Sequence, residues 1–338
     1  MIESLKGKKV FVTGADGFIG SHLVEQLVQH GCQVKALSLY NSLNSWGWLE
    51  HLPESISKSV EICQGDIRDA YQIREQIRGS EVVFHLAALI AIPYSYHAPS
   101  SYVQTNVVGT LNVLQASLDL GVEKFVQTST SEVYGTAQVV PITENHPMKG
   151  QSPYAATKIG ADELALSFYR SFKLPVTVLR PFNTYGPRQS ARAVIPNIII
   201  QALEGKSKIK LGFTSSTRDF SYVLDTARGF MAVASTPESD GEAINLGTQF
   251  EISISDLLTL IGEVMGKNLE IETDSSRLRP EKSEVERLCA SNEKAKKLLG
   301  WAPEFGGRDG LKAGLTKTVE WLSEPSNLKL YKAQIYNL

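Results

Sequence analysis

Cysteine is scarce in this sequence, which has only Cys32, Cys63 and Cys289 among its 338 residues. The three are far apart, no CxxC pair occurs, and no HExxH motif is present. Structural zinc sites and zinc-protease chemistry therefore have no support, and we expect no metal site. Three scattered thiols are typical of a protein in a reducing compartment.

An excess of charge of either sign is also missing. The chain has 34 basic and 36 acidic residues, which gives a formal net charge of −2. A protein that binds the backbone of nucleic acids needs a basic surface, so we expect no nucleic-acid partner. Any anionic ligand has to be held by a local site.

Long apolar segments are absent as well. The first ten residues, MIESLKGKKV, lack the apolar stretch of a signal peptide. The most apolar region, residues 82–92, contains His85 and is too short to cross a bilayer. These features predict a soluble cytoplasmic protein that does not associate with membranes.

The first half of the chain alternates short apolar runs with stretches of helical periodicity. The predicted strands cover residues 9–13, 33–39, 60–64, 81–86, 124–128 and 176–180. The predicted helices cover the segment from Ile19 to Gly31 and residues 70–78, 105–118 and 154–172. This alternation predicts an α/β fold of the Rossmann type, a doubly wound parallel sheet with helices on both faces.

The length of the chain is sufficient for two domains. We expect residues 1–180 to form a dinucleotide-binding domain. After residue 180, loops with proline and glycine become frequent, and further helices are predicted at 194–203, 254–265 and 292–299. Residues 181–338 are therefore predicted to form mainly a smaller mixed α/β substrate domain, with some segments returning to the first domain.

A glycine-rich turn follows the first predicted strand. Residues 13–20 read TGADGFIG, a GxxGxxG pattern between a strand and a helix. Gly14 permits the tight turn, Gly17 lets the backbone approach a pyrophosphate, and Gly20 allows close packing of helix on sheet. The helix N-terminus offers N–H groups and the positive end of its dipole to the phosphates. We predict a dinucleotide site here, which also includes Asp16, Phe18 and Ile19.

The end of the second strand departs from the usual pattern of such a site. An Asp or Glu there accepts a hydrogen bond from the ribose of NAD, whereas this sequence has Ser38. Serine either contacts the ribose or is an ordinary strand-end residue, and no arginine beside it attracts a 2′-phosphate. We expect NAD, with NADP not excluded. After the third strand, Asp66 and Ile67 lie either near the adenine or at the cap of the next helix.

Tyr154 and Lys158 form a YxxxK pair at the start of a predicted helix. Ser152 and Pro153 are typical of its N-cap and first position, and the four-residue spacing places the pair on one helix face. A nearby ammonium and a nicotinamide ring favour the phenolate. Tyr154 can then remove a proton from a substrate hydroxyl while hydride leaves the same carbon. By itself, a YxxxK pair could be an ordinary pair on a helix surface. In a chain that also has the glycine-rich turn, the pair predicts a catalytic site.

A loop rich in hydroxyl groups precedes this pair. Residues 128–135, TSTSEVYG, begin at the end of a predicted strand, where doubly wound sheets bind their ligands. Thr130 is predicted to hydrogen-bond the hydroxyl that is oxidised, with Ser131 beside it in the catalytic set. Glu132 is predicted to be a catalytic carboxylate, and its alternative role is a solvated loop charge or a helix cap.

Together these motifs resemble the extended short-chain dehydrogenase/reductase family, specifically its nucleotide-sugar epimerases and dehydratases. The resemblance covers nearly the whole chain and includes LAA at residues 86–88, TNV at 105–107, RPFNTYGPR at 180–188 and RDF at 218–220. It implies cofactor contacts by Leu86, Ala87, Ala88 and Asn106. It also implies that the second domain binds the nucleotide sugar through Asn183, Arg188, Arg218 and Arg279, because guanidinium groups suit a diphosphate. A surface salt bridge is the alternative for each arginine.

Within this family, Glu132 separates the reactions. The resemblance implies that 4,6-dehydratases use a glutamate here to take the C5 proton, whereas 4-epimerases usually have a small residue. The Thr-Ser-Glu triplet at 130–132 resembles that of GDP-mannose dehydratases and lacks the aspartic acid of another dehydratase branch. The implied activity is that of an NAD-dependent lyase, a nucleotide-sugar 4,6-dehydratase that forms a 4-keto-6-deoxy sugar nucleotide. The alternatives are a 4-epimerase and a UDP-glucuronate decarboxylase, which also has Thr-Ser-Glu.

Two further segments are similar to bacterial N-acetylglucosamine-nucleotide 4,6-dehydratases of surface-glycan pathways. They are YNSLNSWGWLE at residues 40–50 and QSARAVIP at residues 189–196. The resemblance implies UDP-N-acetylglucosamine or a related NDP-hexose as the substrate. Trp46 and Trp48 can equally well serve only to pack a loop.

Relatives in this family commonly form homodimers through the helix that carries Tyr154 and the helix at residues 105–118. We therefore expect a homodimer. Apolar residues that the sequence places on the outer face of the Tyr154 helix are compatible with such a contact: Leu164, Leu166 and Phe168.

Overall fold

The computed structural model describes residues 2–278 and 280–332. Its central sheet has seven strands, all paired in parallel, in the order β10-β6-β5-β4-β1-β2-β3. The strands are β1 (Lys9–Thr13), β2 (Gln33–Leu39), β3 (Val60–Gly65), β4 (Val82–His85), β5 (Lys124–Thr128), β6 (Val176–Pro181) and β10 (Ala243–Leu246). The prediction of a Rossmann-type parallel sheet is confirmed.

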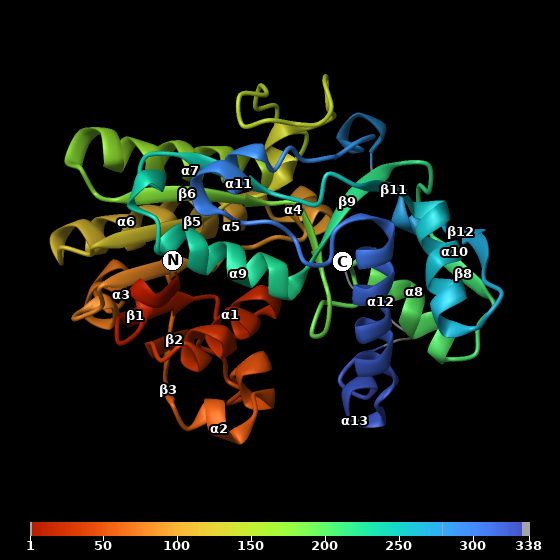
Figure 1. Ribbon diagram of the computed structural model, residues 1–338, viewed down its shortest axis with the longest axis horizontal. Helices are drawn as coiled ribbons and strands as arrows, with labels where there is room; N and C mark the ends of the chain where they lie inside the picture. The colour runs from red at the N-terminus through yellow and green to blue at the C-terminus, as the bar shows by residue number, and fades with distance from the viewer. Residues whose placement is uncertain (1, 279, 333–338) are drawn as a thin grey trace.

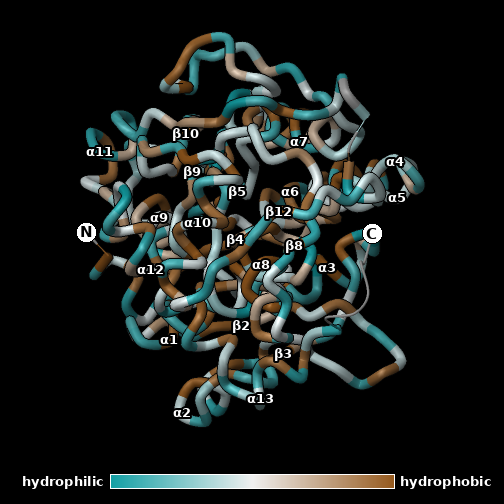
Figure 2. The backbone as a smooth tube through the Cα atoms, turned by 90° about the vertical axis from the view of Figure 1, so that its right-hand side faces the viewer, coloured by the Kyte–Doolittle hydropathy of each residue, from teal (hydrophilic) through white to brown (hydrophobic). Residues whose placement is uncertain are grey.

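Helices cover both faces of this sheet (Figure 1). The larger ones are α1 (Phe18–Gln29) and α9 (Val223–Ala234) on one face, and α3 (Ala70–Ile77), α6 (Gly109–Asp119) and α7 (Pro153–Phe172) on the other. Because side chains alternate along a strand, Val10 and Val12 pack with α1 and α9, whereas Phe11 packs with the other layer. Figure 2 shows apolar segments inside the molecule and many hydrophilic segments outside.

The second part of the chain lies at one end of the large sheet, on the right in Figure 1. It contains a three-stranded sheet, β11-β9-β7, and a two-stranded sheet, β12-β8. These strands are β7 (Asn183–Tyr185), β8 (Lys208–Leu211), β9 (Thr217–Tyr222), β11 (Glu251–Ser253) and β12 (Glu270–Thr273). Three helices form the apolar core with β7, β8, β9 and β11, namely α8 (Val194–Leu203), α10 (Ile254–Met265) and α12 (Gly307–Ser323). The division at residue 180 remains a prediction, although β10 lies in the large sheet.

Several elements differ from the sequence-based expectation. The predicted helix at residues 105–118 is a π-helical segment, η3 (Val103–Val108), followed by α6. Helices α9 and α12 and the short strands of the second part were not predicted. The remaining helices are short: α2 (Glu54–Ser57), α4 (Ile92–His97), α5 (Pro99–Tyr102), α11 (Glu293–Leu299) and α13 (Pro325–Leu328).

The expected outer face of the Tyr154 helix needs a correction. Leu166 and Phe168 are buried in the core between α7 and the sheet, and Leu164 packs against the same core. They therefore stabilise the fold rather than offer a dimer surface. Within the described part of the chain, no helix combines the length and apolar character needed to cross a membrane. Over the same residues, no cluster of His, Cys, Asp and Glu could hold a metal ion.

Candidate active site

A cavity of about 1060 Å³ lies at the carboxyl ends of β1 and β4, between the large sheet and the second part of the chain. Strand β1 has β2 on one side and β4 on the other, so the connections diverge in opposite directions here. Doubly wound sheets bind ligands at this point, because loops from both directions leave a crevice. The volume is at the upper end of what single small ligands need, so it can hold more than one bound group.

The glycine turn forms one end of the cavity. Gly14 has a φ of +65°, and a Cβ there would come within 2.7 Å of the Ala87 nitrogen. A Cβ on Gly20 would lie 2.1 Å from the carbonyl oxygen of Gly14. Gly17 is the N-cap of α1, and no side chain caps this helix end. The turn is thus bare backbone at a helix N-terminus, which fits the pyrophosphate of a dinucleotide.

The segment after β4 lies directly against this turn. Leu86, Ala87 and Ala88, for which cofactor contacts were predicted, line the cavity. Asn106 is buried and lies outside the lining. Its side chain forms two hydrogen bonds with the backbone of Leu89: Oδ1 accepts from the Leu89 nitrogen at 2.8 Å, and Nδ2 donates to the Leu89 carbonyl oxygen at 2.9 Å. Asn106 therefore positions the wall of the cavity.

Two carboxylates, those of Asp16 and Asp66, lie at the carboxyl ends of β2 and β3, on the other side of β1. Asp16 lines the cavity, while Ser38 is buried and donates to Asp16 Oδ2 at 3.1 Å. Asp66 and Ile67 also line the cavity, and the guanidinium of Arg68, bonded to Asp66, lowers the pKa of that carboxyl. The cap of α3 is Asp69, so Asp66 does not have the helix-cap role considered for it.

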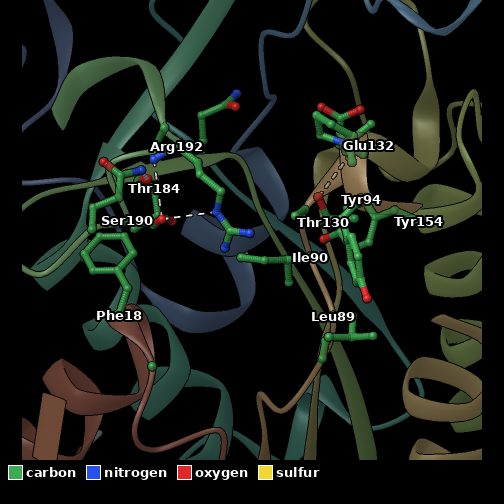
Figure 3. A pocket seen from close by; sticks show the side chains of 18 of the residues that line it. Phe18, Leu89, Ile90, Tyr94, Thr130, Glu132, Tyr154, Thr184, Ser190 and Arg192 are labelled. Atoms are coloured by element: carbon green, nitrogen blue, oxygen red, sulfur yellow. Dashed lines mark hydrogen bonds between the residues drawn. The ribbon is translucent and has the colours of Figure 1, made fainter. Parts of the chain in front are cut away.

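Four of the predicted catalytic residues line the same cavity: Thr130, Ser131, Glu132 and Tyr154. Figure 3 labels Thr130, Glu132 and Tyr154. Thr130 is the N-cap of the 3₁₀ helix η4 (Ser131–Tyr134), and its hydroxyl accepts from the Glu132 nitrogen at 3.2 Å. This cap fixes the backbone position of Glu132. The Glu132 side chain is half-buried. Burial raises the pKa of Tyr154, and the hydrogen bond with Thr130 opposes that shift. Ser131 is buried beside them and also contributes to the lining.

Lys158 is buried and is not part of the cavity lining. Its Nζ donates to the carbonyl oxygen of Thr128 at 2.5 Å. Burial lowers the pKa of Lys158 to about 8, and the charge of Asp162 opposes the shift. Lys158 therefore carries its proton at neutral pH and places a positive charge one helical turn from Tyr154.

Asp162 is a residue that the sequence analysis missed. It is fully buried, accepts from Ser129 Oγ at 2.6 Å and pairs with Arg180 Nε at 3.1 Å. Tyr154, Lys158 and Asp162 recur every four residues, so they share one face of α7. That spacing was a signal available in the sequence, and the charge of Asp162 supports the protonated form of Lys158.

The predicted substrate residues separate into two groups. Asn183 and Arg218 line the cavity, and Arg218 Nη2 lies 3.2 Å from Glu284 Oε1. Arg188 is buried outside the lining, where its guanidinium pairs with Glu25 at 3.0 Å and approaches Ser21 Oγ, so the structure does not bring it to the site. Arg279 lies outside the described residues.

Arg192 lines the cavity, although the sequence analysis did not select it. Its exposed side chain extends between Ser190 and Ile90 (Figure 3). The Nε atom donates to Ser190 Oγ at 3.2 Å, and among the described residues no carboxylate forms an ion pair with Arg192. The guanidinium is thus available to an anionic ligand.

The two segments that resemble N-acetylglucosamine-nucleotide dehydratases lie in different places. In the second, Gln189, Ser190 and residues 192–195 line the cavity. No described residue of the first, at 40–50, belongs to the lining. Trp48 there packs its ring against Trp321 and Tyr331, so a packing role is observed for it.

Comparisons with known proteins agree with this geometry. The sequence profile described as GDP-mannose 4,6 dehydratase matches residues 11–313. The chain is 33% identical over 310 residues to the low-salt glycan biosynthesis protein Agl12 of Haloferax volcanii, covering 90% of this chain and 96% of that protein. It is 36% identical over 326 residues to a UDP-glucose 4-epimerase of Mycolicibacterium smegmatis, covering 94% and 99%. The crystal structure of DesIV, a dTDP-glucose 4,6-dehydratase from Streptomyces venezuelae with NAD and TYD bound, superimposes with a TM-score of 0.84 at 29% identity, covering 96% and 99%.

Proposed function

Because the chain belongs to the GDP-mannose 4,6 dehydratase family, within the NAD-dependent nucleotide-sugar dehydratases and epimerases, we propose that it is a nucleotide-sugar 4,6-dehydratase. Its substrate in this proposal is UDP-N-acetylglucosamine or a related NDP-hexose, and its product is the 4-keto-6-deoxy sugar nucleotide. One relative carries the name of a glycan biosynthesis protein, which supports a role of the product in surface-glycan assembly. The three free cysteines support a cytoplasmic location.

The observation that carries the proposal is the position of Glu132. Its side chain lines the same cavity as Thr130 and Tyr154. A 4-epimerase moves hydride to and from one carbon and needs only an acid–base group at the C4 hydroxyl, which Tyr154 provides. A carboxylate beside this pair is needed when a second bond, from C5 to hydrogen, has to be broken.

The glycine turn, Leu86 to Ala88 and the Asp16 end of the cavity would hold the cofactor. When bound, NAD would supply redox chemistry internal to the site, as acceptor of a hydride from C4 and its donor to C6, so that no second redox substrate would be needed. Tyr154 takes the proton of the C4 hydroxyl, and Thr130 orients that hydroxyl with a hydrogen bond. Lys158 keeps a positive charge near the phenol, which stabilises the phenolate form of Tyr154.

Glu132 acts after the C4 ketone has formed. The ketone acidifies the hydrogen on C5, and the Glu132 carboxylate removes it. The same group, now protonated, returns its proton to the departing C6 hydroxyl, which leaves as water. When the hydride has been added at C6, C5 takes up a proton, which balances the one that Tyr154 removed from the C4 hydroxyl. This double role follows from the Thr-Ser-Glu triplet, since Ser131 stands where another acid would otherwise be.

The substrate phosphates lie at the other end of the cavity in this proposal. Asn183 and Arg218 were expected there and line the cavity. We add Arg192, whose guanidinium reaches the cavity without an ion-pair partner among the described residues. A planar guanidinium binds two phosphate oxygens at once, which favours these arginines for a diphosphate.

Two experiments test the reaction. Purified enzyme is incubated with UDP-N-acetylglucosamine, and separately with other sugar nucleotides, without added reductant, and the products are analysed by mass spectrometry. We expect the loss of one water from one of these substrates. An epimer of unchanged mass, or loss of carbon dioxide from a uronate, would contradict the proposal.

The second experiment uses Glu132→Gln. The variant should complete the first hydride transfer and then stall, so that NADH absorbance builds up while dehydration falls by about a hundredfold or more, as for loss of a general base. Glu163→Gln, on the exposed side of α7, removes the same charge outside the cavity and should keep normal activity. A 4-epimerase would keep most of its activity in both variants.

A further inference from the structure

We propose that Asp16 makes this enzyme selective for NAD over NADP, because it supplies the carboxylate that the end of β2 lacks. The inference rests on the proposed use of NAD and concerns the adenosine end of the cavity. It explains how a chain with Ser38 at the usual position of an acidic residue can still reject a 2′-phosphate.

The geometry places the Asp16 carboxylate at the carboxyl end of β2. Its Oδ2 atom accepts from the hydroxyl of Ser38 at 3.1 Å and from the backbone nitrogen of Leu39 at 3.0 Å. These are the last two residues of the strand. In dinucleotide sites of this type, an acidic side chain at the end of this strand accepts a hydrogen bond from the ribose 2′-hydroxyl. Here the acid reaches the same place from the glycine turn.

One oxygen of Asp16 remains for a ligand. Both hydrogen bonds go to Oδ2, and within residues 2–278 and 280–332 no hydrogen bond goes to Oδ1. Asp16 also lines the cavity. The bonded oxygen fixes the orientation of the carboxylate, so the second oxygen is preorganised to accept from a ribose hydroxyl.

The loop after β2 holds the backbone of Asp16 in place. The backbone nitrogen of Trp48 donates to the Asp16 carbonyl oxygen at 3.0 Å. Gly47 has a φ of +56°, and a Cβ there would lie 2.6 Å from the same oxygen. The Trp48 ring is fixed by contacts with His51, Trp321 and Tyr331. Residues 46–48, Trp-Gly-Trp, thus stabilise the position of the Asp16 backbone at this end of the cavity.

The neighbouring strand end does not offer a free cation to a 2′-phosphate. Leu39 pairs with Gly65 of β3, so Asp66 and Arg68 follow close by. Arg68 Nε lies 3.0 Å and 2.9 Å from the two carboxylate oxygens of Asp66, which compensate its charge. A 2′-phosphate would therefore meet the Asp16 carboxylate, and like charges at short range disfavour binding.

The test measures retention of the cofactor rather than catalysis. Wild type, Asp16→Asn and Asp16→Ser are each incubated with equal concentrations of NAD and NADP, separated from free nucleotide and denatured. The released dinucleotides are quantified by chromatography, and titration calorimetry gives each dissociation constant. Asp119→Asn is the control, because it removes the same charge from an exposed side chain that pairs with Arg74 on the protein surface.

We expect wild type and Asp119→Asn to retain NAD almost exclusively. The ratio of NAD to NADP should fall by about tenfold or more in both Asp16 variants, since each tenfold change corresponds to ~1.4 kcal/mol of lost repulsion and hydrogen bonding. An unchanged ratio in the Asp16 variants would overturn the proposal, and so would a wild type that retains neither dinucleotide. A wild type that holds NAD with the expected selectivity but dehydrates no sugar nucleotide would refute the proposed reaction alone.

Discussion

At the scale of single residues, His85 shows how the end of β1 and the segment after β4 are kept in one arrangement. Thr13 Oγ1 accepts from the nitrogens of Leu86 and Ala87, so its own proton goes to His85 Nδ1, 2.8 Å away. Thr110 donates to the Asn106 carbonyl oxygen, so His85 Nε2 donates to Thr110 Oγ1 at 3.0 Å. The surroundings therefore select one neutral tautomer. Burial, together with the Lys158 charge, lowers the pKa of His85 to about 3.

This residue makes stability depend on pH. The unfolded chain binds a proton at His85 below about pH 6.5, whereas the folded protein does so only near pH 3, so the free energy of unfolding decreases as pH falls between these values. The decrease attributable to His85 is ~1.4 kcal/mol per pH unit. Urea unfolding of wild type and His85→Asn at pH 6.5 and 5 should show a smaller decrease in the variant. Burial also raises the pKa of Asp219 to about 6, which increases the free energy of unfolding as pH falls. Both proteins contain Asp219, so its contribution cancels when the two decreases are compared. Equal decreases would refute the assignment.

At the scale of elements, helix α7 sets the position of Tyr154. The Ser152 hydroxyl accepts from the Ala155 nitrogen at 3.1 Å and caps the helix, and Pro153 follows in the first turn. Tyr154 leaves the helix in that same turn. The other end is closed by Lys173 in the left-handed region, with a φ of +64°. The position of the phenol thus depends on the N-terminal cap more than on the C-terminal one.

Loss of the cap should affect both stability and activity. Ser152→Ala is expected to lower the free energy of unfolding by about 1 kcal/mol. It should also lower kcat, because the first turn that carries Tyr154 loses a fixed hydrogen bond. Lys173→Gly, which changes the opposite end of the same helix and removes a left-handed lysine, should leave kcat unchanged. Urea unfolding and steady-state kinetics of both variants check this, and an identical kcat for Ser152→Ala would count against it.

At the scale of the whole molecule, the cavity lies between two parts of the chain, and each part has its own apolar core. The glycine turn and α7 belong to the layers around the large sheet, whereas Arg192, Asn183 and Arg218 come from the second part. Contacts between remote segments connect the two parts, such as those of the Trp48 ring with the rings of Trp321 and Tyr331.

A homodimer through η3, α6 and α7 remains our proposal for the assembly. Val103 and Leu111 on these helices are 45% and 39% exposed, and they are the residues that an equivalent helix pair could cover. Leu111→Arg should convert a dimer to a monomer, measured by light scattering after size-exclusion chromatography. Leu224→Arg is the matched control, because Leu224 is 36% exposed on α9, on the opposite face of the sheet. A monomeric wild type, or a dimeric Leu111→Arg variant, would contradict this assembly.

The sequence by itself determined the features that depend on local spacing. The glycine turn, the YxxxK pair and the strands of the Rossmann half are readable because hydrophobic periods and backbone demands act over a few residues. The short strands of the second part escaped this reasoning. Strand β9 buries Arg218 and Asp219, and β12 is exposed at every position, so neither shows an alternating pattern.

The tertiary structure decided what distant segments do to one another. Arg188 and Arg192 lie four residues apart in one loop, yet one pairs with Glu25 of α1 and the other enters the cavity. Asp16 and Ser38 are 22 residues apart, and only the pairing of β1 with β2 brings the carboxylate to the strand end. The physical reason is that burial and charge compensation depend on neighbours in space, which the order of residues along the chain does not specify.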